Sequence, residues 1–502
     1  MSDGLNHAGD TQPRPERRSR RRARRQPVRW LWPVVGVAVV LVVLGWVVLR
    51  SVNRSSETGA PGVLTGARTN CSTANDVYAA PDGSSQNDGS HDRPIDLATA
   101  LSSTSPAHPC DTVWLRGGTY HGAFTSGLSG REGAPVMVRQ MPGERATIDS
   151  APSNESALSV NGAYVWFWGV EITNSDPQRT STDTASWPSD LKRATGVMVH
   201  GSHLKFIDMV VHDMSRGFEI GGDAIDVEVY GSLIFYNGWE NPQHVGNGSA
   251  IDTYNRVGAR RLADNIIFDQ FSQGISAYSS STVVNLKLEG NILFNNGSLS
   301  KTFGRDILIG GGGGAQAPTL LGNMTYGGAQ TAIGYGSGCT EARIESNYLA
   351  STVPLILTKC DGVVKGNTFV GTVGSLSTAY PDNTYDPKPP AGVVVLSRRN
   401  EYEPGRANIG VYNWDKKADI DLDLSESGLA SGDAYEIRDA KNFFGAPLAK
   451  GTWAQGAKVT VRVGNLTSAK PVGQGLVVPP QTAPEFLALV VVPVRTKSES
   501  IR

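Results

Sequence analysis

Two acidic residues occupy matching places in successive segments of the chain. Glu219 lies in the segment FEIGG and Asp252 in the segment AIDTYN. If the two segments are stacked strands, the carboxyl groups lie about 5 Å apart. Such closeness raises the pKa of one carboxyl, so that a protonated and an ionised group stand side by side. Glycoside hydrolysis requires this combination, and the short separation favours a retaining mechanism.

Other polar and aromatic residues extend the candidate site. His200 and Tyr254 are further catalytic candidates, because they are predicted to lie on the same outer face as the two carboxylates. The predicted substrate-binding residues are Tyr278, Arg216, Arg256, His244 and Trp187. Asp223 and Asp226, in GGDAIDVE, could widen the acidic patch or bind Ca²⁺ through oxygen ligands. No other cofactor is predicted.

The same residues leave a second chemistry open. A polysaccharide lyase needs a base that removes the proton beside a uronate carboxylate, and a cation that neutralises this carboxylate. The residues available for these roles are Tyr254, Tyr278, His200, His212, His244, Arg216, Arg256 and Lys192. A uronate epimerase would share them. The alternative from another class is a non-catalytic glycan-binding or scaffold protein, in which the acids are ordinary solvated residues.

The elements that must position these residues repeat about every two dozen residues, as expected of a solenoid. Each unit has a β run, a loop, a second β run, and a polar residue before an apolar and aromatic pair. The aligned polar residues are Asp208, Ser232, Asn265, Asn291, Asn323, Asn347 and Asn367. A repeated Asn can stack in a ladder, and the neighbouring aromatic residues can stack beside it. These aromatic residues are Phe235, Phe268, Phe294 and Tyr326.

Roughly residues 76–380 resemble the right-handed parallel β-helix superfamily typified by pectate lyases. The opening segments VYAAPDGSSQNDGS, DTVWLRGGTYHG and APVMVRQMPGERATID are similar to the N-terminal cap and first coils of bacterial secreted members. The resemblance implies that the active groove follows the first of three parallel sheets. The N-T-D, G-H-G and R-I-K motifs of polygalacturonases and the pectate lyase signatures are absent. No catalytic residue is therefore carried over from relatives.

The ladder residues are assigned to the turn between the second and third sheets. The first sheet is then formed by VMVHG, FEIGG, AIDTYN, ISAYS, ILIGG and AIGYG. Alternation along a strand sorts its side chains into two faces. The inward residues are Val197, Val199, Phe218, Ile220, Ile251 and Ile275, and the outward residues are His200, Glu219, Asp252, Tyr254, Ser276 and Tyr278.

A different unit follows the β-helix. Residues 381–391 are rich in proline and are predicted to be a linker, and residues 392–494 read as a small antiparallel β-sandwich with a tail at 495–502. The sandwich is similar to accessory domains of glycan-processing enzymes. It could bind a glycan, or it could cover the last coil and shield its open edge.

The N-terminal residues predict a membrane anchor. Residues 1–29 contain nine arginines against three acids and form a basic cytoplasmic tail, and residues 30–49 are twenty uncharged residues that read as one transmembrane helix. Residues 50–75 would link this helix to an extracytoplasmic main domain. A cleaved secretory signal is the alternative. The formal net charge of -1 arises from this basic tail and an acidic remainder, so no nucleic acid is expected as a partner.

The four cysteines suit an extracytoplasmic location, although they allow three connectivities. Cys71 and Cys110 bracket the start of the folded part, and Cys339 and Cys360 occupy corresponding places in consecutive repeats. We therefore predict the disulfides 71–110 and 339–360.

Together these patterns predict an all-β chain, with one transmembrane helix, a right-handed parallel β-helix (solenoid) and a small antiparallel β-sandwich. The predicted function is that of a membrane-anchored extracytoplasmic carbohydrate-active enzyme. It would cleave a polysaccharide as a hydrolase or lyase in the groove along the first sheet.

Overall fold

The structure is a computed structural model that describes residues 71, 74–183, 185, 187–301, 304–473 and 476–494. The predicted basic tail, the predicted transmembrane helix at residues 30–49, most of the linker at 50–75 and the tail at 495–502 lie outside the described residues. Among the residues that are described, no helix has the length and apolar character needed to cross a membrane.

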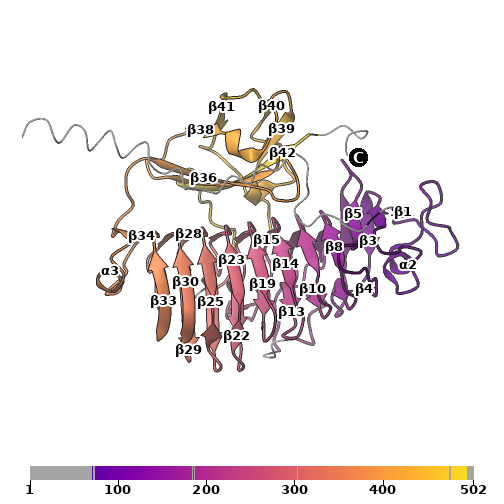
Figure 1. Ribbon diagram of the computed structural model, residues 1–502, viewed down its shortest axis with the longest axis horizontal. Helices are drawn as coiled ribbons and strands as arrows, with labels where there is room; N and C mark the ends of the chain where they lie inside the picture. Colours follow the sequence, from indigo (N-terminus) through magenta and orange to yellow (C-terminus); the bar gives the residue numbers. More distant parts are fainter. Residues whose placement is uncertain are drawn as a thin grey trace, which may run out of the picture. The chain divides into compact units, whose positions relative to one another are not determined.

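Three parallel sheets run along the β-helix, and their strands follow one another coil by coil (Figure 1). In the described residues the first sheet has nine strands: β4 (Phe124–Ser126), β7 (Leu158–Val160), β10 (Thr195–Val199), β13 (Arg216–Ile220), β18 (Ser249–Thr253), β21 (Gln273–Tyr278), β25 (Arg305–Gly311), β29 (Gln330–Gly336) and β32 (Leu355–Leu357). The second has thirteen: β1 (Asp76–Ala79), β2 (Thr112–Leu115), β5 (Val136–Gln140), β8 (Val165–Trp168), β11 (Lys205–Ile207), β14 (Val227–Tyr230), β19 (Arg260–Ala263), β22 (Val283–Val284), β23 (Leu286–Glu289), β26 (Ala315–Gln316), β27 (Thr319–Leu321), β30 (Cys339–Glu345) and β33 (Cys360–Lys365). The third has eleven: β3 (Gly118–His121), β6 (Ala146–Asp149), β9 (Glu171–Thr173), β12 (Val210–His212), β15 (Leu233–Phe235), β20 (Ile266–Phe268), β24 (Ile292–Phe294), β28 (Met324–Gly327), β31 (Tyr348–Ser351), β34 (Thr368–Val370) and β35 (Thr384–Asp386).

The interior of the coils is one continuous apolar core. The residues predicted to point inward from the first sheet are all fully buried in it: Val197, Val199, Phe218, Ile220, Ile251 and Ile275. Their alternation with outward residues follows from the period of two along each strand. The three-sheet assignment made from the sequence is therefore confirmed.

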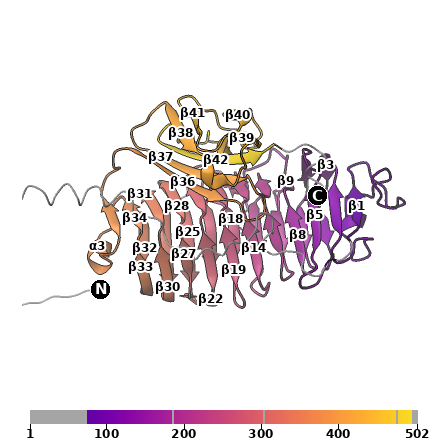
Figure 2. The ribbon, with the colours of Figure 1, turned by 45° about the horizontal axis from the view of Figure 1, so that its top comes forward.

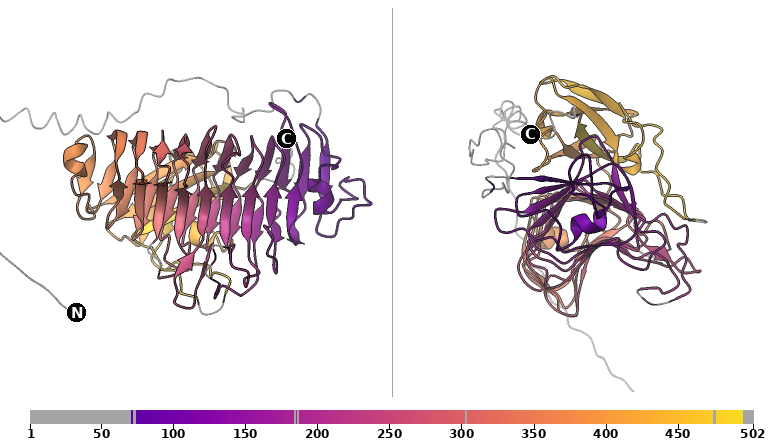
Figure 3. Two further views of the ribbon diagram at one scale, coloured as in Figure 1. Left: turned by 90° about the horizontal axis from the view of Figure 1, so that it is seen from below. Right: turned by 90° about the vertical axis from the view of Figure 1, so that its right-hand side faces the viewer.

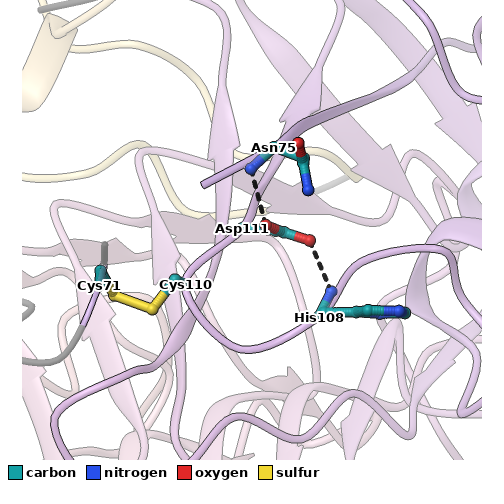
Figure 4. The surroundings of a disulfide bond; sticks show 5 residues. All are labelled: Cys71, Asn75, His108, Cys110 and Asp111. Atoms are coloured by element: carbon teal, nitrogen blue, oxygen red, sulfur yellow. Dashed lines mark hydrogen bonds between the residues drawn. A yellow bond between two sulfur atoms is a disulfide. The ribbon is translucent and has the colours of Figure 1, made fainter. Parts of the chain in front are cut away.

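The N-terminal end of the stack is closed by a helix and a disulfide. Helix α2 (Leu97–Leu101) starts at Asp96, whose carboxylate accepts a hydrogen bond from the Thr99 backbone at 2.9 Å, and it lies across the open end of the coils (Figure 3). Cys71 is bonded to Cys110, next to Asp111, which accepts hydrogen bonds from the Asn75 and His108 backbones (Figure 4).

The second disulfide joins Cys339 to Cys360, which are register partners on β30 and β33. Both predicted disulfides are therefore confirmed. At the far end of the stack lies the short helix α3 (Leu376–Ala379).

The predicted asparagine ladder follows the turn between the second and third sheets. Asn323 illustrates its pattern, because its Nδ2 donates to the Leu288 carbonyl and to Asn347 Oδ1, at 2.8 and 3.0 Å. Its own Oδ1 accepts from the backbone and side-chain amides of Asn291, at 3.0 and 2.9 Å. The ladder contains Asn265, Asn291, Asn323, Asn347, Asn367 and Asn383.

Two details of this turn differ from the positions that the alignment of the repeats predicts. The backbone of Met209, not that of Asp208, donates to Ser232 Oγ, so Met209 holds the ladder position. Asp208 directly precedes Met209, just as Gly231 directly precedes Ser232 on the next coil. Both residues have a positive φ, of 51° and 62°. Asp tolerates this left-handed conformation better than most residues do. The other difference is that β35 and Asn383 lie in the stretch 381–391, so the coil pattern extends into the expected linker.

Aromatic residues form a row on the outer face of the third sheet. The rings of Phe235, Phe268 and Phe294 stack at successive centroid distances of 5.0 Å, as predicted. Tyr326 belongs to the same face but stacks on Phe486 of the C-terminal unit at 4.6 Å. An apolar row of this size is stable only when another element covers it.

The C-terminal unit supplies that cover. Its strands form a five-stranded and a two-stranded antiparallel sheet within the described residues: β36 (Val393–Arg399), β37 (Ala407–Asn413), β39 (Ala434–Asp439), β40 (Ala449–Thr452) and β42 (Phe486–Pro493), with β38 (Asp419–Asp423) and β41 (Lys458–Arg462). Two 3₁₀ turns lie at Ser425–Ser427 and Ala440–Asn442. The predicted antiparallel unit is thus present. Its expected position over the last coil is corrected, because the unit lies along several coils of the β-helix (Figure 2). Its residues Tyr412, Phe486 and Val490 pack against the aromatic row of the third sheet.

A buried ion pair fixes this unit to the coils. Lys441 Nζ lies 2.6 Å from Asp269 Oδ2 and donates to the Pro480 carbonyl at 2.8 Å, and both charged side chains are almost fully buried. We expect Lys441→Met to lower the free energy of unfolding by about 3–5 kcal/mol, because Asp269 is left as an unpaired buried charge. Thermal unfolding compares this variant with Lys450→Met, which changes an exposed lysine. Equal melting temperatures for the two variants would contradict a stabilising role for the pair.

Candidate functional site

Glu219 and Asp252 are direct neighbours on the outer face of the first sheet. Strands β13 and β18 pair in parallel with Glu219 beside Asp252, and Met198 and Ser276 occupy the same position on the flanking strands. Paired residues on adjacent strands are about 4.8 Å apart along the stack. We call Glu219 and Asp252 the carboxylate pair. Its register is the one that the repeat alignment predicts.

Asp252 is held by hydrogen bonds to both carboxylate oxygens. Arg216 Nε donates to Oδ2 at 2.7 Å, and Ser249 Oγ donates to Oδ1 at 3.0 Å. The ion pair with Arg216 is almost fully buried, so its hydrogen bond is charge-assisted in a poorly solvated place. Asp252 is therefore a fixed carboxylate at the surface of the sheet.

Arg216 also joins the pair to the polar loop between β9 and β10. The centre of its guanidinium group lies 3.9 Å from the ring centroid of Trp187, a cation–π contact. The Trp187 side chain is 48% exposed, so a broad aromatic surface remains open beside the carboxylates. The structure thus brings together two predicted substrate-binding residues and one predicted catalytic residue.

Glu219 has a different environment from Asp252. Its Oε2 is buried and has no hydrogen-bond partner among the described residues. Burial raises the pKa of Glu219 to about 7, and the charge of Asp252 adds to the increase while Arg216 opposes it. The pair thus joins a buried carboxyl whose pKa is raised to a carboxyl that is held by Arg216 and Ser249.

Tyr254 and His200 border the pair. Tyr254 directly follows β18, and burial together with the charges of Asp252 and Glu219 raises its pKa to about 12. Its hydroxyl is therefore a hydrogen-bond donor at neutral pH rather than a base. His200 directly follows β10 and is exposed.

An exposed aromatic pair lies farther along the same sheet, on the first and third strands after β18. Tyr278 and Tyr335 have ring centroids 6.1 Å apart and are 50% and 41% exposed. They lie on either side of Gly310, which pairs with both. The Arg305 guanidinium group lies 5.1 Å from the Tyr335 ring.

Tyr335 and Arg305 are not among the site residues that the sequence predicts. Plain alternation from the buried Ile333 would send Tyr335 inward. The register between β25 and β29 shifts after Ile309, so that Gly310 pairs with Tyr335 instead of Gly334. A bulge of this kind reverses the side-chain alternation. The glycines on either side of Tyr335, Gly334 and Gly336 with φ of 76° and 84°, are a local signal of the bulge.

The remaining predicted residues do not reach the carboxylate pair. Arg256 pairs with Asp223 at 2.7 Å, and Asp226 lies 3.5 Å from His203. His244 pairs with Glu240 at 3.0 Å in the loop around β16 (Trp239–Glu240) and β17 (Gly246–Asn247).

His212 lies on the third sheet and not on the first. It is buried between Glu171 and Asp213, at 2.9 and 2.8 Å. Burial lowers the pKa of His212, but the hydrogen bonds that its ring donates to these two carboxylates outweigh the burial and raise the pKa to about 9. This histidine is a structural cation.

The predicted Ca²⁺ ligands Asp223 and Asp226 are directed to different basic partners. Across the described ranges, no group of three or more His, Cys, Asp or Glu side chains converges as a metal site would require. Calcium binding at these two residues stays a prediction.

Comparisons with known proteins agree with this architecture. Residues 77–314 match a family model described as Pel9A-like, right handed beta helix region. This part of the chain folds as a right-handed parallel β-helix and is similar to that family. The β-helix predicted from the sequence is thereby confirmed. No curated protein sequence matches the chain.

Similar solved structures share only low sequence identity with the chain. Pectate lyase Pel9A is 20% identical with a TM-score of 0.43, over 63% of this chain and 86% of its own. A GH136 lacto-N-biosidase from Eubacterium ramulus is 12% identical with a TM-score of 0.35, over 62% of this chain and 67% of its own. A rhamnogalacturonan lyase is also 12% identical, with a TM-score of 0.34, over 62% of this chain and 86% of its own.

Proposed function

We propose that this protein is a carbohydrate-active enzyme that hydrolyses glycosidic bonds of a polysaccharide at the carboxylate pair. The observation that carries the proposal is the contrast between two adjacent carboxyl groups. Glu219 is buried with a raised pKa, and Asp252 is bound by Arg216 and Ser249. The Pel9A-like β-helix supports a polysaccharide as substrate, because that family takes its name from a pectate lyase.

The two groups divide the reaction between them. Glu219 donates its proton to the glycosidic oxygen as the leaving sugar departs, and Asp252 attacks the anomeric carbon to form a glycosyl ester. Glu219 then accepts a proton from water, which attacks the anomeric carbon and releases Asp252. The spacing of neighbouring strands, about 5 Å, suits this retaining route better than an inverting one.

The environment of Tyr254 makes a lyase the weaker candidate. A lyase base must accept a proton at the working pH, and the raised pKa of Tyr254, about 12, opposes that role. Tyr254 fits better as a hydrogen-bond donor to a sugar hydroxyl. His200 remains a candidate base for elimination or epimerisation, because it directly follows β10 on the preceding coil.

Tyr278 and Tyr335 are proposed as a sugar-stacking subsite of the same face. We expect Tyr335→Ala to raise KM about tenfold on long chains, through loss of a stacking contact, while kcat stays nearly constant. The Tyr335 side chain is 41% exposed, so its removal should leave the fold intact. Steady-state kinetics with long and short oligosaccharides test this, and an equal effect on the shortest cleaved substrate would contradict a remote subsite.

The function is tested by incubating residues 71–494 with neutral and acidic polysaccharides. A hydrolase releases new reducing ends alone, whereas a lyase also releases ultraviolet-absorbing unsaturated ends. An epimerase alters composition without shortening the chain, and a binding protein only retards it. We expect hydrolysis of at least one polysaccharide of the panel. If the protein binds polysaccharides of the panel but cleaves none of them, the proposed hydrolase activity is contradicted.

We also propose that the enzyme is anchored in the cell membrane with its main domain outside the cytoplasm. The uncharged residues 30–49 behind an arginine-rich tail support this topology, and so do the two disulfides, which are typical of oxidising compartments. Fractionation of the full chain is expected to recover it with membranes. Recovery in the supernatant, with an intact N-terminus, would contradict the anchor.

A further inference from the structure

A cavity of about 360 Å³ lies between the last coils and the C-terminal unit, away from the first sheet. One wall comes from β28, β31 and β34 of the third sheet, and the other from Trp414 and Glu485 of the C-terminal unit. Small-ligand sites of about 300–1,000 Å³ commonly form at such domain junctions.

The aromatic walls of the cavity are held in place before any ligand binds. Tyr326 stacks on Phe486 and donates its hydroxyl to Glu485 Oε1 at 3.0 Å. Trp414 stacks on Tyr412, with ring centroids 5.5 Å apart, and its Nε1 donates to Tyr348 Oη at 3.1 Å. Because these polar atoms are already satisfied, the faces of Tyr326 and Trp414 that are not stacked on Phe486 and Tyr412 form rigid apolar surfaces.

The polar groups of the cavity suit a ligand rich in hydroxyl groups. Ser351 Oγ is buried and has no hydrogen-bond partner among the residues described, although it belongs to a residue that lines the cavity. A buried hydroxyl without a partner is costly, and a ligand could satisfy it. Thr352 and Thr372 add two exposed hydroxyl groups to the rim.

The charge of the cavity is balanced. Glu485 Oε2 lies 2.5 Å from Lys416 Nζ, so the one carboxylate in the lining already has a cationic partner. An anionic ligand would find no free cation among these lining groups, and a cationic ligand would have to compete with Lys416. The surroundings therefore favour an uncharged ligand.

We propose that this cavity binds one neutral pyranose unit, with its apolar face against Trp414 or Tyr326 and its hydroxyl groups on Ser351, Thr352 and Thr372. A pyranose combines an apolar C–H face with hydroxyl groups at its edge, which matches the rigid rings and the unsatisfied serine. The site lies on the third sheet and is separate from the carboxylate pair on the first. It would hold the enzyme on a glycan without cleaving it, and it does not depend on the proposed hydrolysis.

The test titrates the disulfide-bonded protein with glucose, galactose, N-acetylglucosamine and glucuronate, followed by saturation-transfer NMR. At least one neutral sugar is expected to bind. Ser351→Ala should weaken its binding about tenfold, the effect of one lost hydrogen bond of about 1.4 kcal/mol. Thr372→Trp, which fills the cavity from an exposed position, should abolish binding.

Two control variants separate this site from others. Ser397→Ala removes a second buried serine hydroxyl that lacks a partner but lies outside the cavity, so binding should be unchanged. Glu219→Gln should also leave binding unchanged, even if it removes activity. Absence of binding by all three neutral sugars, undiminished binding by Thr372→Trp, or binding of glucuronate that is as strong as that of the best neutral sugar would overturn the proposal.

Discussion

Glu219→Gln is expected to lower kcat for polysaccharide hydrolysis by about 10²–10⁴-fold, the usual contribution of a general acid. Glutamine keeps the shape of the side chain but cannot donate a proton to the leaving oxygen. Because Glu219 Oε2 is buried without a partner, the neutral amide should not destabilise the fold. Glu341→Gln makes the same chemical change at an exposed position of β30 on the second sheet and should keep full activity.

The pH dependence of activity tests the role of Glu219 independently. The pKa of Glu219, raised to about 7, keeps the side chain protonated below this pH, so kcat/KM should fall as pH rises through about 7. A carboxyl with a raised pKa also contributes stability that is lost as pH rises through its folded-state value. Glu219→Gln should therefore be at least as stable as the wild type above pH 7. Wild-type activity in this variant would remove Glu219 from the mechanism.

Asn323→Ala is expected to lower the free energy of unfolding by about 3–5 kcal/mol, because several buried hydrogen bonds are lost at once. The variant leaves the Leu288 carbonyl and the Asn291 amide without their partners, and it opens a small cavity in the turn. Its neighbours Asn291 and Asn347 also lose one side of the ladder.

Chemical denaturation measures this loss against Asn154→Ala, which changes an exposed asparagine in a loop. The ladder variant should unfold at a clearly lower denaturant concentration, and the loop variant should unfold as the wild type does. If the free energies of unfolding of the two variants differ by less than about 1 kcal/mol, the ladder does not stabilise the fold.

The sequence predicts those parts of the fold in which the same residue pattern recurs from coil to coil. Asn265, Asn291 and Asn323 recur before an apolar and aromatic pair, so the ladder could be derived from spacing. The three parallel sheets followed from the resemblance to right-handed parallel β-helices. The pairing of Glu219 with Asp252 follows from the same register. The disulfide between Cys339 and Cys360 follows from it as well.

The parts that could not be predicted depend on local breaks in the repeat or on contacts between remote segments. Tyr335 joins Tyr278 through a register shift that alternation cannot anticipate. Arg216 lies three residues before Glu219 on the same strand, yet its contact with Trp187 depends on the path of a long loop. The third-sheet aromatic row could be predicted, but not the fact that Phe486 and Tyr412 cover it.

The C-terminal unit has more than a covering role in this structure. Lys441 reaches into the coils to pair with Asp269, and Glu485 and Trp414 complete the cavity beside β28 and β31. The same packing that shields the aromatic row therefore builds a polar and aromatic pocket at its edge. Loss of this unit should affect both stability and the proposed sugar binding.

Hydrolysis at the carboxylate pair is tested most directly by time-resolved proton NMR of a polysaccharide during cleavage by the wild type. The first product is predicted to carry a saturated reducing end in the anomeric configuration of the original bond, and its signal should be absent with Glu219→Gln and with Asp252→Asn. An inverted first product would rule out the covalent role of Asp252. Unsaturated ends, or cleavage that persists in both variants, would contradict hydrolysis at this pair.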